Sequence, residues 1–281
     1  MNPAAFIRRA AKMKSVREYF DSLGFIEVET PVRIAAPAPE PNIDCPPVAT
    51  GGFLRASPEL QMKRLLACGM EKIFQTGPCF RDGEKGSRHN PEFSMLEWYR
   101  AGATYREIAR DLEGLLDAVG IDAGTPKRIG VREAYAKFAG WDPWTAWDKD
   151  RFDEDMATKI EPAVAAMGGG VFLCDYPVQA ASLALVADGP EGRHAERWEF
   201  YFEGMEIANA FTELCDADEQ RKRFREAAAE RKALGEADYP VDAEFLEALP
   251  RIGSAAGAAL GLDRLFMVLT GESRISSVRF V

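Results

Sequence analysis

Residues 80–100 read FRDGEKGSRHNPEFSMLEWYR, and this stretch decides the fold. Residues 73–81 and 93–100 are rich in apolar and aromatic side chains and favour strands. The loop between them holds Asp, Gly and Asn residues that promote turns, so we expect two antiparallel strands joined by a long hairpin loop. Alternation along the second strand places four side chains on one face of the sheet: Phe93, Met95, Glu97 and Tyr99.

Helices and further strands surround this hairpin. Helical spacing of apolar residues predicts helices over 4–23 and 103–119, and capping signals predict two more, from Ser57 and over 217–234. Strand patterns occupy residues 25–31, 171–177, 196–202 and 204–211, whereas the proline-rich residues 35–52 form a loop. We therefore expect one α+β domain over residues 1–281, an antiparallel sheet flanked by helices, with a variable insertion near 120–170.

Residues 257–271, GAALGLDRLFMVLTG, predict a strand, a turn of small residues and a helix. Small residues let a ligand approach the backbone closely. Arg264 lies at the expected helix start, where the helix dipole and free N–H groups favour a phosphate. The glycines fit tight packing equally well, so this segment alone does not establish a phosphate site.

Charged side chains at the expected strand ends suit a nucleotide and an amine. Arg81 follows the first strand of the hairpin and has the planar fork that binds a phosphate in a bidentate manner. Glu97 and Tyr99 would offer a carboxylate and a phenol to an ammonium group. Taken alone, Arg81 fits a surface salt bridge better than a phosphate site.

A third charged segment, EIANAFTE at residues 206–213, suits a divalent cation. Two carboxylates and an amide on one strand can hold magnesium between phosphate oxygens. The alternative is a hairpin whose glutamates are solvated. Strict alternation places Glu206 and Glu213 on opposite faces, so both can act together only if a bulge or a strand end intervenes.

Composition narrows the class of protein. The chain has 281 residues, 47% of them hydrophobic, and a net charge of −10, which disfavours a long nucleic acid as partner. Its five cysteines include no CxxC pair, which argues against a disulfide scaffold or a zinc cluster. We find no apolar run long enough for a membrane span and no signal-peptide core, so we expect a cytoplasmic enzyme.

The order of these segments resembles the class II aminoacyl-tRNA synthetases. Residues 24–32, GFIEVETPV, look like motif 1, residues 80–100 like motif 2, and residues 257–265, GAALGLDRL, like motif 3. Within the family, SPELQMKRLL, HNPEFSMLEWYR and GMEIANAFTEL resemble lysyl-tRNA synthetases, and most of all their short paralogues that ligate (R)-β-lysine to elongation factor P. The resemblance covers nearly the whole chain, except residues 35–52 and 120–170.

The resemblance implies a set of site residues. ATP would contact Arg81, Asp82, Gly83, Asn90, Glu206, Ile207, Gly261 and Arg264, to which we add Glu84 and Phe93. The amino acid would contact Ser57, Glu59, Tyr99 and Glu213, to which we add Glu97, Asn209 and Ala259. Catalysis would rest on Arg81, Arg264, Glu206 and Glu213, and the two glutamates would bind Mg²⁺. Motif 1 implies a homodimer.

Three positions depart from the family pattern. A glutamate often stands two places after the motif 2 arginine, where this chain has Gly83 followed by Glu84. The usual Asn-Gly pair is Asn209-Ala210 here. Ala259, as in the paralogue, stands where lysyl-tRNA synthetases tend to have glycine, and we expect its methyl group to reshape the pocket for β-lysine. The alternative is that the alanine only fills a packing gap.

The implied reaction needs no side-chain nucleophile. The substrate carboxylate attacks the α-phosphorus of ATP, pyrophosphate leaves, and the resulting adenylate acylates an amine or hydroxyl. The first expected helix starts within ten residues of Met1, which leaves no room for a preceding anticodon-binding barrel. Together with the negative charge, this favours a lysine of elongation factor P over tRNA as the acceptor.

Two alternatives remain open from the sequence. The first is a minimal enzyme that charges tRNA or joins an activated amino acid to a small molecule. The second is an inactive synthetase-like subunit that only binds or regulates. Such subunits usually lose the motif 2 or motif 3 arginine, and this chain retains both Arg81 and Arg264.

Overall fold

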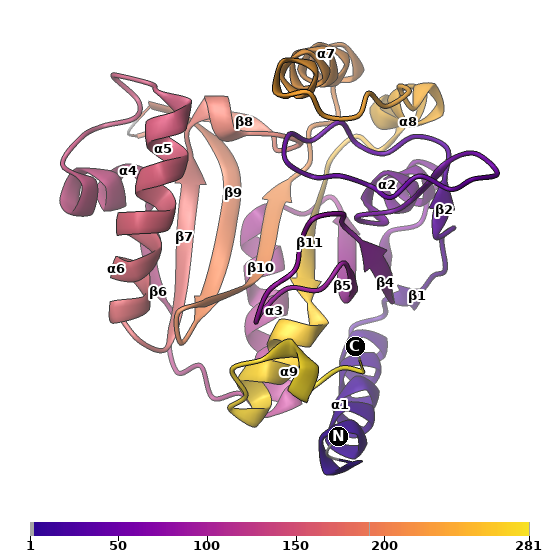
Figure 1. The fold of residues 1–281 in the computed structure, drawn as a ribbon, viewed down its shortest axis with the longest axis vertical. Helices are drawn as coiled ribbons and strands as arrows, with labels where there is room; N and C mark the ends of the chain where they lie inside the picture. Colours follow the sequence, from indigo (N-terminus) through magenta and orange to yellow (C-terminus); the bar gives the residue numbers. More distant parts are fainter. Residues whose placement is uncertain (1–2, 191, 281) are drawn as a thin grey trace.

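The computed structural model describes residues 3–190 and 192–280, and within them one sheet of nine strands runs through the molecule (Figure 1). The strand order is β1-β4-β5-β11-β10-β9-β7-β6, with β8 paired to β9, and β2 and β3 form a separate ribbon. The strands are β1 (Ile26–Glu27), β2 (Arg33–Ile34), β3 (Phe53–Leu54), β4 (Lys72–Phe80), β5 (Glu92–Ala101), β6 (Lys127–Gly130), β7 (Gly170–Tyr176), β8 (Val186–Gly189), β9 (Gly192–Phe202), β10 (Met205–Thr212) and β11 (Ala255–Gly261).

Helices lie against both faces of this sheet and beyond its ends. The α-helices are α1 (Pro3–Ser22), α2 (Glu59–Ala67), α3 (Tyr105–Val119), α4 (Val131–Ala134), α5 (Lys149–Asp155), α6 (Glu161–Ala166), α7 (Ala217–Leu234), α8 (Ala243–Ala248) and α9 (Leu262–Thr270). Short π-helical segments, Tyr135–Ala139 and Met156–Ile160, follow α4 and α5. Single 3₁₀ turns cover Val178–Ala180, Leu249–Arg251 and Ile275–Ser277.

One face of the sheet forms the main hydrophobic core. Antiparallel register aligns a row of side chains across four neighbouring strands: Trp98, Ala258, Ala210 and Trp198. The two tryptophans are fully buried beneath α1, α3 and α9, whose apolar residues complete the same cluster. Small alanines on the two central strands leave room for the large indoles on the outer strands, so the helices pack closely against the sheet.

The opposite face carries polar side chains, because successive residues of a strand point to opposite sides. The next row across the same four strands is Glu97, Ala259, Asn209 and Glu199, and the row after it is Tyr99, Gly257, Phe211 and Arg197. Phe93, Met95, Glu97 and Tyr99 therefore share one face, as the alternation predicts. The register brings a cluster of charged groups onto the middle of the sheet.

Residues 120–170, expected as a variable insertion, are packed into the same sheet. β6 pairs in parallel with β7, and apolar residues of α4, α5 and α6 share a buried cluster with β7 and Tyr201. These helices cover the polar-row face at its β7 end, as Figure 1 shows. The segment thus forms one side wall of the region above the central strands.

The predicted α+β class with helices around a mostly antiparallel sheet is confirmed, and the hairpin of β4 and β5 forms as expected. The strand predicted over residues 25–31 is wrong beyond Glu27. Thr30 donates its N–H and hydroxyl to the Gln75 side chain, at 3.1 and 2.9 Å, and Pro31 has no N–H for a ladder. Within the described residues, no helix is long and apolar enough to cross a membrane.

Gly257 supports the wall of this polar face, and its replacement provides a test. A Cβ atom at Gly257 would lie 2.1 Å from Cδ1 of Tyr99, so Gly257→Ala must displace that buried ring. We expect a loss of about 1–3 kcal/mol in the free energy of unfolding, measured by urea denaturation. Gly130→Ala is the control, because a Cβ there meets no atom within 4 Å. Equal stability of Gly257→Ala and the wild type would contradict the packing described.

Candidate active site

A cavity of about 300 Å³ opens over the polar rows of β5, β11 and β10. Most of the predicted site residues line it: Ser57, Glu59, Arg81, Glu84, Asn90, Phe93, Glu97, Tyr99, Glu206, Ile207, Asn209, Ala259, Gly261 and Arg264. Asp82 and Gly83, which are exposed in the hairpin loop, do not line it. Glu213 does not line it either, and its position corrects the predicted metal site.

Glu97 forms the polar floor of the cavity. The Ser57 hydroxyl donates to its Oε1 at 2.6 Å, and the Tyr99 hydroxyl donates to its Oε2 at 2.7 Å. Burial and then the charge of Glu59 raise the pKa of Glu97 to about 7, although both hydrogen bonds favour the ionised form. A cationic group brought into the cavity would stabilise the carboxylate of Glu97.

Lys63 of α2 connects Glu59, at the cavity, to Glu213, which follows the end of β10. Its Nζ lies 2.5 Å from Glu59 Oε1 and also contacts Glu213, and the ammonium is buried on all sides. Burial opposes this charge, but Glu213 and Glu59 outweigh it and hold the pKa of Lys63 above its ordinary value. The spacing of Glu59 and Lys63 along α2 allows the first contact, whereas the second depends on β10, far away in sequence.

Arg81 lies where the hairpin opens toward the cavity. Its backbone N–H donates to Pro91 O at 2.9 Å, which closes the base of the loop directly after β4. The guanidinium lies 5.2 Å from the centre of the Phe93 ring, and its Nη1 is 3.4 Å from Glu84 Oε1. This contact with Phe93 helps to hold the guanidinium at the cavity, which Arg81 lines.

Arg264 occupies the first turn of α9, as predicted. Its Nη1 donates to the Glu206 backbone oxygen at 3.0 Å and to Glu206 Oε2 at 2.9 Å. Its Nη2 lies 2.5 Å from Nε2 of His89, which the sequence did not mark as a site residue. Burial, followed by the charge of Arg264, lowers the pKa of His89, so the neutral ring accepts this hydrogen bond.

The predicted metal pair of Glu206 and Glu213 is wrong. Glu213 lies seven positions after Glu206, just beyond the end of β10, or roughly 20 Å away at about 3.3 Å per residue. A β-bulge between Glu206 and Ala208 does occur, but it directs Glu206 toward Arg264 while Glu213 contacts Lys63. Among the described residues, no group of three or more His, Cys, Asp or Glu side chains is arranged to hold a metal ion.

Glu199, which was not among the predicted site residues, is the carboxylate that accompanies Glu206. Burial and then the charge of Glu199 raise the pKa of Glu206, which places the two carboxylates near each other. Glu199 accepts hydrogen bonds from Arg197 Nη2 at 2.6 Å and from the Tyr201 hydroxyl at 2.7 Å. The alternation of Arg197, Glu199 and Tyr201 with apolar residues along β9 was the signal that could have revealed this row.

The cavity therefore has two chemically different ends. Arg81 and Arg264 can receive a polyphosphate at one end, where Glu199 and Glu206 supply oxygen atoms suited to a hard cation. Glu97 and Glu59 lie at the other end and suit ammonium groups. The arrangement fits a nucleotide and an amine-bearing carboxylate placed side by side.

Removal of the Lys63 ammonium tests whether it balances the buried carboxylates. Lys63→Met should lower the free energy of unfolding by about 3–5 kcal/mol, because it leaves Glu59 and Glu213 without their buried cation. Adding Glu213→Gln to the same protein should recover part of this loss, since one uncompensated charge is removed. Urea denaturation of both variants near pH 7.5 measures the effect, and a single variant as stable as the wild type would refute the pairing.

Comparison with known proteins agrees with this geometry. The model of the family "tRNA synthetases class II (D, K and N)" matches residues 2–280. The chain is 35% identical to a protein of Proteus mirabilis named elongation factor P–(R)-β-lysine ligase, over 98% of this chain and 94% of that protein. Proteins with the same name from Yersinia enterocolitica and Vibrio cholerae are each 34% identical, over 98% and 96% of this chain and 94% and 93% of their own lengths. The chain therefore belongs to the class II tRNA synthetases.

Proposed function

We propose that this chain activates lysine or (R)-β-lysine with ATP and transfers the resulting aminoacyl group to a lysine side chain of elongation factor P. One observation carries the proposal: a single cavity connects the phosphate-binding arginines Arg81 and Arg264 to the buried carboxylate of Glu97. The names of the relatives support the choice of amino acid and acceptor.

Adenylate formation requires placement and charge stabilisation. The substrate carboxylate attacks the α-phosphorus, the bond to the β-phosphate oxygen breaks, and pyrophosphate leaves with the electron pair. Arg81 faces the reacting α-phosphate and neutralises the charge that builds on it. Arg264, fixed by Glu206 and His89, binds the departing pyrophosphate from the start of α9.

Glu199 and Glu206 are the residues that would hold Mg²⁺. Both carboxylates line one end of the cavity, where burial and the charge of Glu199 raise the pKa of Glu206, and oxygen ligands suit this ion. Bound Mg²⁺ supplies charge neutralisation of the phosphate oxygens. Arg197 and Tyr201 hold Glu199 in place through their hydrogen bonds, so this carboxylate is oriented as a metal ligand before the nucleotide binds.

The distal ammonium of the amino acid binds at Glu97. Ser57 and Tyr99 hold both oxygens of this carboxylate from opposite sides, so it points into the cavity with little freedom to move. Ala259 lies directly between Glu97 and Asn209 in the polar row, beneath the carbon chain of the substrate. Its methyl group narrows the cavity there, which bears on the choice between α- and β-amino isomers.

We place this reaction in the cytoplasm and in a homodimer. Ile7 on α1 and Ile26 on β1 are 70% and 55% exposed; Ile26 belongs to the motif 1 segment, residues 24–32, and Ile7 lies on the helix that precedes it. Large aliphatic side chains exposed on adjacent elements favour a protein interface. A dimer of this kind would cover them.

Modification of the acceptor tests the proposed function as a whole. The protein is incubated with ATP, Mg²⁺, α-lysine or (R)-β-lysine, and unmodified elongation factor P, and the intact mass of the factor is measured. We expect one lysyl adduct on a lysine side chain, located by peptide mass spectrometry, with at least one of the two isomers. Efficient charging of purified tRNA with no adduct on the protein would refute the proposed acceptor.

Replacement of either arginine should affect chemistry rather than folding. We expect Arg81→Ala and Arg264→Ala each to slow adenylate formation by about 10²-fold or more, because each removes charge stabilisation in the transition state. Single-turnover release of pyrophosphate measures the rate. Thermal denaturation is the control, since both side chains lie at the cavity rather than in the core, and near-normal rates in Arg81→Ala would remove it from this role.

The pH dependence follows from the pKa of Glu97, which burial raises to about 7. The group is neutral below this value and ionised above it, and only the ionised form pairs with an ammonium. At saturating ATP, kcat/KM for the amino acid should rise about tenfold per pH unit below pH 7 and level off above it. Glu97→Gln should abolish the rise, and a wild-type profile that is flat or falling across this range would contradict the assignment.

A further inference from the structure

Glu40 is a cavity residue to which neither the motifs nor the proposed mechanism gives a role. It lies in the loop of residues 35–52 between β2 and β3, which runs beneath α7 and α8 in Figure 1. Glu40 lines the same cavity as Glu59, Arg81 and Glu97, and it also borders the neighbouring cavity that Lys149 and Glu230 line. A charged residue on a loop reaches such a cavity reproducibly only if the loop backbone is fixed.

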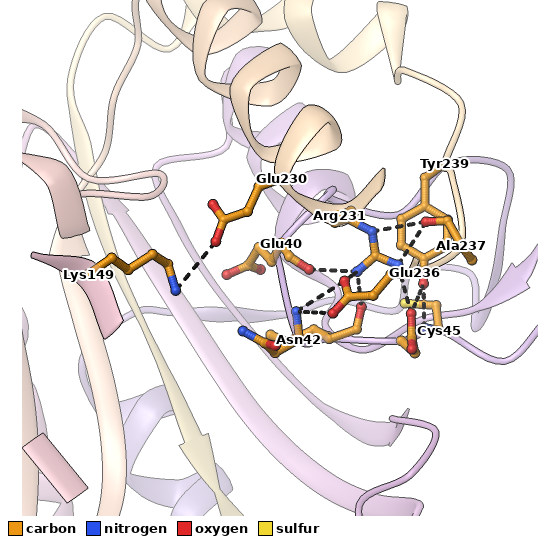
Figure 2. A network of polar contacts seen from close by, with 11 residues as sticks. Glu40, Asn42, Cys45, Lys149, Glu230, Arg231, Glu236, Ala237 and Tyr239 are labelled. Carbon is orange, nitrogen blue, oxygen red and sulfur yellow. Dashed lines mark hydrogen bonds and ion pairs between the residues drawn. The ribbon is translucent and has the colours of Figure 1, made fainter. Parts of the chain in front are cut away.

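Arg231 of α7 fixes that backbone. Its buried guanidinium donates to the backbone oxygens of Glu40 and Ile43, at 2.8 and 3.0 Å, and to Asp44 Oδ1 at 2.7 Å. It also donates to Ala237 O at 2.9 Å, so one side chain ties the loop to the segment after α7 (Figure 2). A buried charge with this many acceptors is costly to displace, which holds the loop in one position.

Two more contacts hold the same loop. The Asn42 N–H donates to Glu236 Oε1 at 3.1 Å, and the Cys45 N–H donates to the Tyr239 hydroxyl at 2.8 Å. Figure 2 shows these bonds meeting around Arg231, with Glu40 at the edge of the network. The backbone on both sides of the loop turn is therefore held from α7 and the segment that follows it.

The Glu40 carboxylate takes no part in this network. Figure 2 shows it directed away from Arg231, and within residues 3–190 and 192–280 it has no hydrogen bond or ion pair, while its backbone oxygen is bonded. Burial and then the charge of Glu59 raise its pKa, and Arg81, Arg197 and Lys63 oppose the increase. A carboxylate held rigidly in a cavity beside another carboxylate is a binding group for a cation.

The neighbours of Glu40 indicate which ammonium it receives. The charge of Arg81, which faces the reacting carboxylate in the proposed reaction, is among the main influences on the pKa of Glu40. The pKa of Glu97 responds mainly to Glu59 and Arg55 instead. Glu97 is also the deeper of the two, because it is buried and Glu40 is partly exposed. Glu97 thus suits the distal ammonium, and Glu40 suits the amino group near the carboxylate.

We propose that Glu40, held over the cavity by the Arg231 network, binds the amino group nearest the substrate carboxylate and is a specificity-determining residue. This inference rests on the proposed function and deepens it, because α- and β-lysine differ in the place of this amino group. Glu59 lies beside Glu40 and shares the contact. The distal ammonium remains the ligand of Glu97.

The test separates the two amino groups by chemistry. ATP–pyrophosphate exchange is measured for wild type, Glu40→Gln and Glu40→Asp with α-lysine and (R)-β-lysine. Norleucine, which lacks the distal amino group, and 6-aminohexanoate, which lacks the proximal one, serve as competitive inhibitors. Glu40→Gln should raise KM for the preferred lysine isomer about tenfold or more and weaken norleucine similarly. It should leave KM for ATP and inhibition by 6-aminohexanoate within about twofold, and Glu40→Asp should lie between.

Glu230→Gln is the matched control, because it removes a carboxylate beside Arg231 that pairs with Lys149 at 3.4 Å, outside the cavity. Its kinetic constants should equal those of the wild type. Unchanged KM for the lysine isomer in Glu40→Gln, or equal weakening of both inhibitors, would overturn the role of Glu40 and leave the proposed function standing. Wild-type protein that shows no exchange with either isomer would overturn both.

Discussion

The alternation of side chains across β5, β11, β10 and β9 is the constraint on which both the core and the cavity depend. Aligned register turns Trp98 and Trp198 toward the helices, and the same register turns Glu97 and Glu199 toward the cavity. A slip of one residue would exchange the two sets and bury the carboxylates among apolar side chains. The small residues of β11 leave space for the large side chains of the neighbouring strands. Gly257, for example, leaves space for the ring of Tyr99.

Charge balance in the cavity follows from this arrangement. Arg81 and Arg264 face a nucleotide at one end and Glu59 and Glu97 lie toward the other, while Glu40 is close enough to feel the charges of both Glu59 and Arg81. Lys63 compensates Glu59 and Glu213 from below the floor. Ionisation of the carboxylates that line the cavity becomes favourable when a substrate brings its own ammonium groups. The affinity for a substrate therefore depends on the number and position of its amino groups.

Local sequence patterns predicted much of this structure, and contacts between residues distant in the sequence determined the rest. Alternation placed Glu97 and Tyr99 on the cavity face, and helix-start signals placed Arg264. The pairing of Glu206 with Glu213 failed because sequence spacing conceals the length of an extended strand. Lys63 and Glu40 were not anticipated, since the partners of Lys63 and the Arg231 anchor of the Glu40 loop come from distant elements.

If one cavity activates a diamino acid with ATP, pyrophosphate exchange must depend on the amino groups of the added substrate. Wild-type protein is assayed with ATP, labelled pyrophosphate and each of the standard amino acids, together with both lysine isomers. We expect exchange with one or both lysine isomers and background exchange with norleucine and the monoamino acids. Exchange that ignores the added amino acid, or that norleucine supports as well as lysine, would contradict this expectation.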